Sequence, residues 1–538
     1  MKKKLVYLKP NVVIEPLYFR WYAWSHLISP ATAAMNIVGR HLKIMDSYIQ
    51  APQIHAAAVE NPKLLGGPFM DYSGRDRSEE IRGLRNETIT KGAVQLQFVE
   101  AINQLDRILK EHEKGFSLEP LYEKVPDILR GYVELVYDLN NNPSFRFIEA
   151  LLYKTPLYDE SFQSISLWVT ENDERPFVLS TPRLDDEKVL NLEIPFRHPF
   201  IDAVSRMKRE PSTLEDLLET VDFDIANWSL FESFFTEEAP PRYERYEGDS
   251  IRMRYFGHAC ILLETKHTAI LVDPLISYYG YQQEVERFSD ADLPDTIDYV
   301  LITHNHQDHI LFETLLPLRH KIRNLVVPRT NSGALQDPCL KLMFRETGFT
   351  NVIEIGQLEE LVFDDCVLTG IPFVGEHCDL NIGTKSCYHV KTDDFSVLFC
   401  ADSCNVEPRL YQHIQKLIGN VDVLFLGMEC DGAPLTWLYG PLLTEELSRE
   451  KDYSRRLAGC NYQRGMHLVK AFSPKEIYVY AMGLEPWLEF ISSIRFDENA
   501  NPIVASNNLV ATCTDMGIIS ERLFGEKELL YAAVLVEG

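Results

Sequence analysis

The sequence lacks any apolar run as long as the roughly 18 residues that a membrane-spanning helix needs. Its first residues are basic, but Lys9, Pro10 and Glu15 interrupt any signal-peptide core. Basic residues are scarce overall: 53 lysines and arginines stand against 80 aspartates and glutamates, a formal net charge of −27. Because binding to phosphates needs a basic surface, this balance argues against a nucleic-acid partner. We expect a cytoplasmic protein that binds neither membranes nor nucleic acids.

Cysteine is absent from the first 259 residues, and all ten cysteines lie between Cys260 and Cys513. They form neither the paired CxxC pattern of structural zinc sites nor the spacing of iron–sulfur ligands. In a reducing compartment we expect buried free thiols instead. The length of 538 residues exceeds one ordinary domain, and the one-sided cysteine distribution indicates two units of different origin.

The first part of the chain predicts a mixture of helices and strands. Apolar residues recur at helical spacing in 94–109 and in 122–139, whereas 161–200 contains the strand-like segments SISLWV and PFVLS. The aromatic segment 18–24 suits either a dimer contact, since aromatic residues are enriched at interfaces, or the core of a domain. We favour the core.

The pattern changes after a polar stretch, 235–250, whose two prolines and many charges are typical of a linker. Apolar, β-branched strands with short turns follow at 251–264 and 268–274, and helical stretches then alternate with strands to the end of the chain. This is the rhythm of an α/β domain. We predict a mixed α/β N-terminal domain over residues 1–245 and a second domain over residues 246–538.

The densest chemical signal is THNHQDH, residues 303–309, directly after a strand with a buried character. His304 and His306 lie two apart in an extended chain and point to the same side, and Asp308 and His309 follow where a helix begins. A loop at the end of a strand can direct several side chains into one cavity. A single histidine is usually structural, but this density of ligand types indicates parts of two metal shells.

The motif HxHxDH after an apolar strand resembles the signature of the metallo-β-lactamase superfamily. Further segments match in order: GHACILLE with TAILVDP, which contains Asp273, then FVGEHCDL with His377 and VLFCADSC with Asp402. The resemblance covers about residues 250–538 and implies an αββα sandwich for that domain. It also implies that His377 is a metal ligand and that the Asp402 carboxylate bridges two metal ions.

The chain departs from this superfamily at one ligand position. Members usually supply a last histidine after a late strand, but the matching segment, 476–487, contains none. Glu485 partly replaces it or the position is open, while His467 on the preceding amphipathic helix is structural. Glu376, next to His377, adds a carboxylate instead. Zinc is content with nitrogen and sulfur donors, whereas carboxylate-rich sites with open positions suit iron or manganese.

The whole chain resembles a narrower group, the di-iron β-hydroxylases that tailor nonribosomal peptides, such as that of chloramphenicol biosynthesis. The segments NVVIEPLYFRWYAW, SPATAA, IMDSYIQAPQ and GGPF look like this family, and so does FVGEHCDL. The resemblance implies that Glu376 is an iron ligand and that His377 is either a ligand or an outer residue that orients the ligands. The implied metal ligands are His304, His306, Asp308, His309, Glu376 and Asp402.

By this resemblance the protein is an O2-dependent monooxygenase with two iron ions. It would hydroxylate the β-carbon of an aminoacyl group held as a thioester on a carrier domain of a nonribosomal peptide synthetase. Electrons would come from an external donor, because the sequence has no Rossmann glycine fingerprint and no iron–sulfur pattern. The N-terminal domain would serve dimerisation, or docking of the substrate or carrier. The candidate catalytic residues are Glu376, His377 and Glu429.

Two other functions stay open. A dinuclear hydrolase on the same fold, with zinc or manganese, would direct a metal-bound hydroxide at an ester, lactone or thioester. A non-enzymatic partner of a biosynthetic assembly would keep only a vestigial metal site. Near the motif, His258 is either an outer residue of the metal site or structural, and Trp437 and Tyr439 are either pocket walls or core. The basic group 206–209 is a candidate docking patch for an acidic carrier domain, or ordinary surface.

Overall fold

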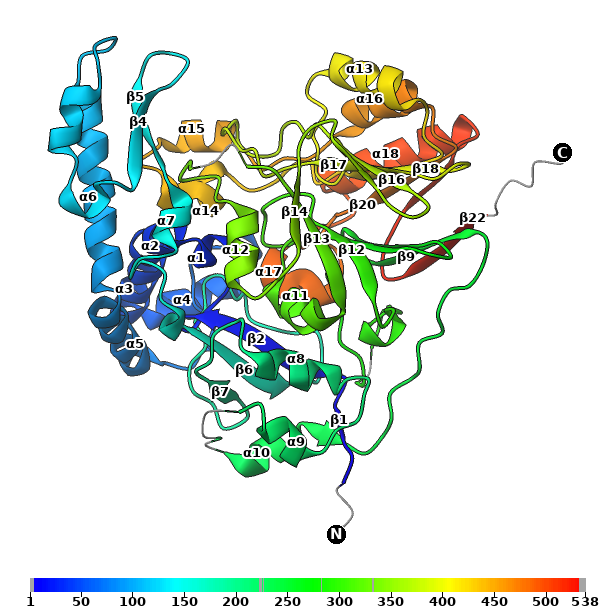
Figure 1. Ribbon diagram of the computed structural model, residues 1–538, viewed down its shortest axis with the longest axis horizontal. Coiled ribbons are helices and arrows are strands. Elements are labelled where there is room, and N and C mark those ends of the chain that lie inside the picture. Colours follow the sequence, from blue (N-terminus) through cyan, green and yellow to red (C-terminus); the bar gives the residue numbers. More distant parts are fainter. Residues whose placement is uncertain (1–3, 222–224, 226, 282, 331–332, 532–538) are drawn as a thin grey trace.

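The computed structural model describes residues 4–221, 225, 227–281, 283–330 and 333–531. Two seven-stranded sheets form its C-terminal half (Figure 1). The first sheet has the strand order β14 (Val352–Ile355), β13 (Ile322–Pro328), β12 (Ile297–Leu301), β11 (Ala269–Val272), β10 (Cys260–Glu264), β9 (Ile251–Gly257) and β22 (Lys527–Tyr531).

The second sheet packs against the first. Its strands from β18 to β21 are parallel neighbours, as are β11 to β14 of the first sheet, so their carboxyl ends meet at one edge of each sheet. The strand order is β15 (Glu360–Val362), β16 (Val367–Ile371), β17 (Cys387–Lys391), β18 (Ser396–Phe399), β19 (Val423–Gly427), β20 (Glu476–Tyr480) and β21 (Ile519–Arg522).

Alternating side chains explain why these strands need helices on their outer faces. Val423 and Phe425 of β19 belong to the cluster between the sheets, whereas Leu424 and Leu426 pack beneath a helical layer. Residues of α11 and α12 likewise join the cluster on the outer face of the first sheet. The architecture is therefore the predicted αββα sandwich. Its covering helices are α11 (Phe312–Leu318), α12 (Leu340–Glu346), α13 (Pro408–Ile418), α16 (Tyr462–Phe472) and α18 (Asn501–Asp515).

The N-terminal half is built on a four-stranded antiparallel sheet. Its order is β3 (Trp21–Tyr22), β2 (Val12–Tyr18), β6 (Gln163–Val169) and β7 (Leu190–Leu192). A hairpin of β4 (Val133–Tyr137) and β5 (Pro143–Phe147) stands beside it, and β1 (Tyr7–Leu8) pairs with β8 (Phe235–Thr236). The helices are α1 (Ser25–Ile28), α2 (Pro30–Asn36), the π-helix η1 (Ile37–His41), α3 (Leu42–Gln50), α4 (Pro52–Val59), α5 (Ser78–Lys91), α6 (Ala93–Glu111), α7 (Glu149–Leu152), α8 (Pro199–Arg206), α9 (Leu214–Leu218) and α10 (Trp228–Ser233).

Some of the secondary-structure predictions for this half are confirmed and others are wrong. The helix expected at 94–109 is confirmed as α6, and the strand SISLWV as β6. The prediction of a helix at 122–139 is wrong. Two 3-10 turns and then strand β4 occupy this segment, because Pro126 interrupts a helix there. Burial then alternates along the first residues of the strand. The segment 176–180 contains turns rather than the expected strand.

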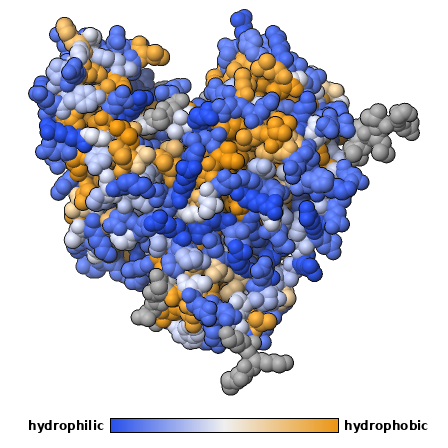
Figure 2. Space-filling model, viewed as in Figure 1, coloured by the Kyte–Doolittle hydropathy of each residue, from blue (hydrophilic) through white to orange (hydrophobic). Residues whose placement is uncertain are grey.

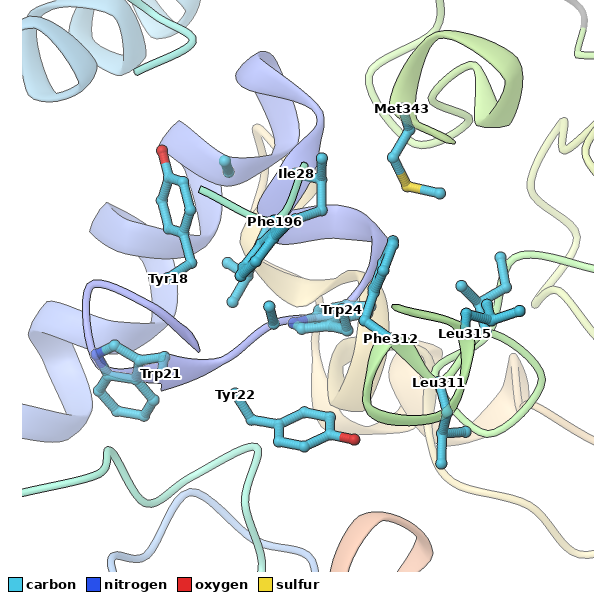
Figure 3. Close-up of a cluster of buried hydrophobic side chains, with 14 of the residues drawn as sticks. Tyr18, Trp21, Tyr22, Trp24, Ile28, Phe196, Leu311, Phe312, Leu315 and Met343 are labelled. Atoms are coloured by element: carbon cyan, nitrogen blue, oxygen red, sulfur yellow. The ribbon is translucent and has the colours of Figure 1, made fainter. Parts of the chain in front are cut away.

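The two halves share one hydrophobic cluster. Figure 3 shows Trp24 beside Phe196 and Phe312, so the residue just before α1, a residue shortly before α8 and the first residue of α11 meet in one place. The rings of Phe196 and Phe312 are stacked, with centroids 6.4 Å apart. Trp21 and Tyr22 are also buried, which confirms that segment 18–24 forms core rather than a dimer contact.

The surface is largely hydrophilic on the face drawn in Figure 2. That face is hollowed between the lobe carrying α6 with the β4–β5 hairpin and the lobe carrying α13 and α16 (Figures 1 and 2). Among the described residues, no helix combines the length and the apolar character that crossing a membrane requires.

A buried ion cluster also joins the two halves. Glu15 on β2 accepts hydrogen bonds from Arg183, and Arg175 donates two hydrogen bonds of 2.8 Å to the Glu313 carboxylate on α11. Burial alone would raise the pKa of Glu15, but the charges of Arg183 and Arg175 outweigh it and the pKa is lowered. α11 begins three residues after the THNHQDH motif, so this cluster holds the element that follows the candidate site.

Replacing Glu313 by Gln should lower the free energy of unfolding by about 3–5 kcal/mol, because Arg175 then loses its main charged partner in a buried position. Thermal and urea unfolding measure the change. The matched control is Glu359→Gln, which breaks an exposed pair with Arg329 and should cost no more than about 1 kcal/mol. Equal effects of the two substitutions would contradict a special role for the buried cluster.

Candidate metal centre

The THNHQDH motif forms the loop after β12, beside the end of β11. Asp273, directly after β11, is buried and accepts hydrogen bonds from the Thr303 backbone N–H at 2.7 Å and the Thr303 hydroxyl at 2.6 Å. Its Oδ2 also lies 2.8 Å from Nδ1 of His309. The carboxylate therefore fixes both ends of the motif and leaves Nε2 of His309 directed into the site.

Three of the predicted ligands meet at one side of the site. His304, His306 and Glu376 bring their ligand atoms within 4.8 Å of one another. Nδ1 of His306 lies 2.9 Å from Oε1 of Glu376. The ring of His377 is 4.5 Å from that of His306, and its Nδ1 lies 2.7 Å from Oε2 of Glu376, but His377 belongs to no such ligand group among the described residues.

A second group is formed by His304, His309 and Asp402. Oδ2 of Asp402 lies 3.2 Å from Nε2 of His309 and 3.7 Å from Nε2 of His304. His304 belongs to both groups, so the Asp402 carboxylate lies beside a ligand of the first group. Gly427, at the end of β19, leaves room for the Asp402 side chain, because a Cβ on this residue would lie 2.7 Å from Oδ1 of Asp402.

The third group contains a residue that the sequence did not single out as a ligand. His258, in the turn between β9 and β10, joins Asp308 and His309, and its Nε2 lies 3.3 Å from Oδ2 of Asp308. A positive φ of 51° turns His258 toward the motif. The sequence indicated this position of His258 only by its place between two strands that precede the motif. A purely structural histidine could occupy the same place.

The loop that carries Glu376 has an unusual backbone. Gly375, Glu376, Cys378 and Asp379 all have positive φ, although left-handed backbone is unfavourable for residues other than glycine. Gly375 is required by space as well, because a Cβ there would meet Cβ of Cys404 at 2.4 Å. Strained backbone of this kind concentrates at functional sites, where surrounding structure holds it in place.

Several buried polar atoms of the site have no hydrogen-bond partner among the described residues. They are Nε2 of His304, Nδ1 of His258, Nε2 of His377 and Oδ1 of Asp402. Unpartnered buried polar groups are costly and rare in folded proteins. Nitrogen and carboxylate donors with free lone pairs that converge within ligand distance are what a pair of metal ions requires, so the residues present fit such a pair.

Electrostatics favour cation binding. Burial, reinforced by the neighbouring His309 and His306, holds the pKa of His304 well below its usual range, so its ring is neutral and can bind a metal. Burial would lower the pKa of His309, but Asp402 and Asp273 raise it, so a metal at Nε2 would replace a proton. Burial and the nearby Asp402 carboxylate raise the pKa of Glu429 well above its usual range.

Other sequence candidates lie elsewhere. Glu485 is buried and accepts a hydrogen bond from the Tyr255 hydroxyl, but among the described residues it is not part of a ligand group. His467 is exposed on α16 and is not part of the core. Tyr439, at the end of α14 (Leu435–Tyr439), is buried with its hydroxyl 3.1 Å from Nε2 of His306.

Comparison with known proteins shows the family of the chain. Residues 7–240 match the diiron non-heme beta-hydroxylase N-terminal domain, and residues 268–433 match the beta-lactamase superfamily domain. The chain is 39% identical over 524 residues to a Streptomyces venezuelae hydroxylase, covering 96% of this chain and 98% of the relative. That relative is named as the 3-hydroxylase of a 4-amino-L-phenylalanyl group on the CmlP peptidyl carrier protein.

Solved structures give the same result. The crystal structure of CmlA, a diiron beta-hydroxylase from Streptomyces venezuelae, matches with a TM-score of 0.92 and 38% identity over 98% of this chain and 100% of that one. A CmlA variant with a glutamate-to-aspartate substitution matches with a TM-score of 0.89 and 37% identity, over 97% and 99% of the two chains. The chain belongs to the diiron non-heme β-hydroxylase family. It is thus a diiron monooxygenase with two iron ions as its cofactor, rather than a hydrolase.

Asp402→Ala should lose most of one or both iron ions, because the carboxylate between the two ligand groups disappears. Iron per chain is measured by elemental analysis after removal of unbound metal. His467→Ala, which removes an exposed histidine on α16, is the control and should keep the wild-type iron content. Full occupancy in Asp402→Ala would refute a bridging role.

Proposed function

We propose that this enzyme hydroxylates the β-carbon of an aminoacyl group held as a thioester on a peptidyl carrier domain. The relative that supports this proposal carries out that reaction according to its name, and it aligns with nearly the whole of this chain. Position 3 of an amino acid is its β-carbon, so the named reaction and the proposed one act on the same atom.

The ligand groups divide between two irons. His304, His306 and Glu376 would hold one iron, Asp308 and His309 the other, and Asp402 would bridge them. When bound there, two irons would supply O2 activation, which takes two electrons from an external donor and two protons for each oxygen atom inserted at Cβ–H and each water released. The fold contributes a buried site, which positions Cβ and keeps bulk water from the oxidant.

Three residues are proposed to assist the chemistry. Glu376 touches the metal site directly, and His377 stands 2.7 Å behind its second oxygen, where it can orient the carboxylate. Glu429 follows β19 and faces Asp402 closely enough for that charge to raise its pKa. Its carboxyl group can therefore hold a proton at the edge of the site, within the same end of the sandwich as the ligands.

The division of labour between the two parts of the chain is also a proposal. We assign residues 1–245 to a family-specific domain for carrier or substrate docking, or for dimerisation, and residues 246–538 to the catalytic domain. The N-terminal half reaches α14, which carries Tyr439: Trp437 of this helix donates a 2.8 Å hydrogen bond from Nε1 to the carbonyl of Gly66. Trp437 thus faces the N-terminal half, and the wall of any side-chain pocket there is built from both parts.

The basic group 206–209 does not form the docking patch that we predicted for an acidic carrier domain. Arg209 is 11% exposed and donates hydrogen bonds to the carbonyls of Asp290 and Leu293, and Lys208 lies over the Tyr278 ring at 5.3 Å. This candidate patch is therefore wrong, because two of its three cations are occupied within the chain. Carrier binding must use other contacts, because a net charge of −27 supplies no general attraction for an acidic carrier domain.

One preparation tests the proposed function. Elemental analysis should find two irons per chain, and the reduced enzyme mixed with O2 and an aminoacyl-loaded carrier should yield a product heavier by one oxygen atom. The same mixture under 18O2 should place the heavy isotope in that product, whereas the free amino acid should react poorly. Two zinc ions with O2-independent release of the acyl group would overturn the proposal in favour of a hydrolase.

A further inference from the structure

Tyr439 makes a contact that no ligand group accounts for. Its hydroxyl lies 3.1 Å from Nε2 of His306, while Nδ1 of the same ring lies 2.9 Å from Oε1 of Glu376. The imidazole of His306 is thus held at both nitrogens, with the metal side at Nδ1 and the phenol at Nε2. A histidine whose Nδ1 binds a metal carries its proton on Nε2, and that N–H needs an acceptor when buried.

The helix that carries Tyr439 is fixed by the N-terminal half. Arg40, from the π-helix η1, is partly buried and donates to the carbonyls of Trp437 and Leu438. Next to it, Gly39 lets the backbones approach, since a Cβ there would meet Pro441 at 3.0 Å. π-helical turns are rare and occur frequently at functional sites. The C-terminal end of α14 therefore has its position set by residues of the other half of the chain.

A further contact runs from the same half to the motif loop. His26 packs against the Tyr439 ring, with centroids 6.1 Å apart, and its Nε2 lies 3.4 Å from the side-chain amide of Asn305. The N-terminal half therefore contacts both Tyr439 and the motif residue between the two ligand histidines.

We propose that Tyr439 is a positioning residue that accepts a hydrogen bond from Nε2–H of His306 and so makes Nδ1 the iron-binding nitrogen, with Arg40 setting its place. The inference rests on the proposed binding of iron by His306. This role of Tyr439 differs from that of a pocket wall, because Tyr439 acts on one iron through His306 rather than on the substrate. The N-terminal half thereby contributes to the metal centre without supplying a ligand.

The principal test is Tyr439→Phe, which removes one oxygen atom and keeps the ring. Loss of an outer partner of a metal-bound histidine typically weakens metal affinity or activity by about 10- to 100-fold. Competition with a chelator should show such a weakening for one of the two irons, and Mössbauer spectra should show altered parameters for that iron alone. The control is Tyr153→Phe, which removes a buried hydroxyl 3.0 Å from Ser29 and should leave both irons as in the wild type.

Specific results would overturn the inference. Wild-type protein without iron would refute the proposed metal centre itself. Two irons in the wild type and unchanged affinity and spectra in Tyr439→Phe would refute only the positioning role. A visible phenolate-to-iron absorption band that disappears in Tyr439→Phe would show that Tyr439 is a ligand instead, and a raised KM with unchanged spectra would show that it contacts substrate.

Arg40→Lys tests the contribution of the N-terminal half separately. Lysine keeps a positive charge but loses the planar group that reaches two carbonyls. The variant should reproduce the spectral change of the same iron, at a smaller amplitude than Tyr439→Phe, with the Tyr439 hydroxyl still present. A folded Arg40→Lys protein with wild-type spectra would overturn the role of Arg40 and leave that of Tyr439 standing.

Discussion

The metal site depends on the carboxylate of Asp273. It is buried beyond the end of β11 and bonded to Thr303 and His309, so one charge fixes both the first and the last residue of the motif. Parallel pairing of β11 with β12 brings the two segments to the same edge of the sheet. Without that anchor, the three imidazoles and the carboxylate of the motif would lack a fixed common orientation.

The sequence predicted the centre of this site better than its margins. His304, His306, Asp308 and His309 lie within six residues, so the geometry of a strand followed by a turn was sufficient to bring them together. His258 lies in a separate turn, and its approach to Asp308 arises only from the packing of β10 against its neighbours. A single histidine without a spacing partner carries no sequence signal for that approach.

The N-terminal half shows the same limit in its secondary structure and packing. The α6 pattern was readable because a long amphipathic helix encodes its own periodicity, whereas segment 122–139 had apolar residues that fitted helix and strand alike until Pro126 decided between them. Trp24 was predicted as core, but its neighbours Phe196 and Phe312 lie far along the chain. Such long-range contacts join the domains and follow from the whole fold.

The cysteine distribution allows thiol labelling to measure unfolding of one part of the chain. Eight of the ten thiols are buried, and Cys339 and Cys430 are half-buried. Burial raises the pKa of both of these thiols to about 11, so a thiol reagent at neutral pH meets little thiolate on the folded protein. Because no cysteine precedes residue 260, rapid labelling would record opening of the metal-binding half alone, and loss of N-terminal structure would stay silent to the reagent.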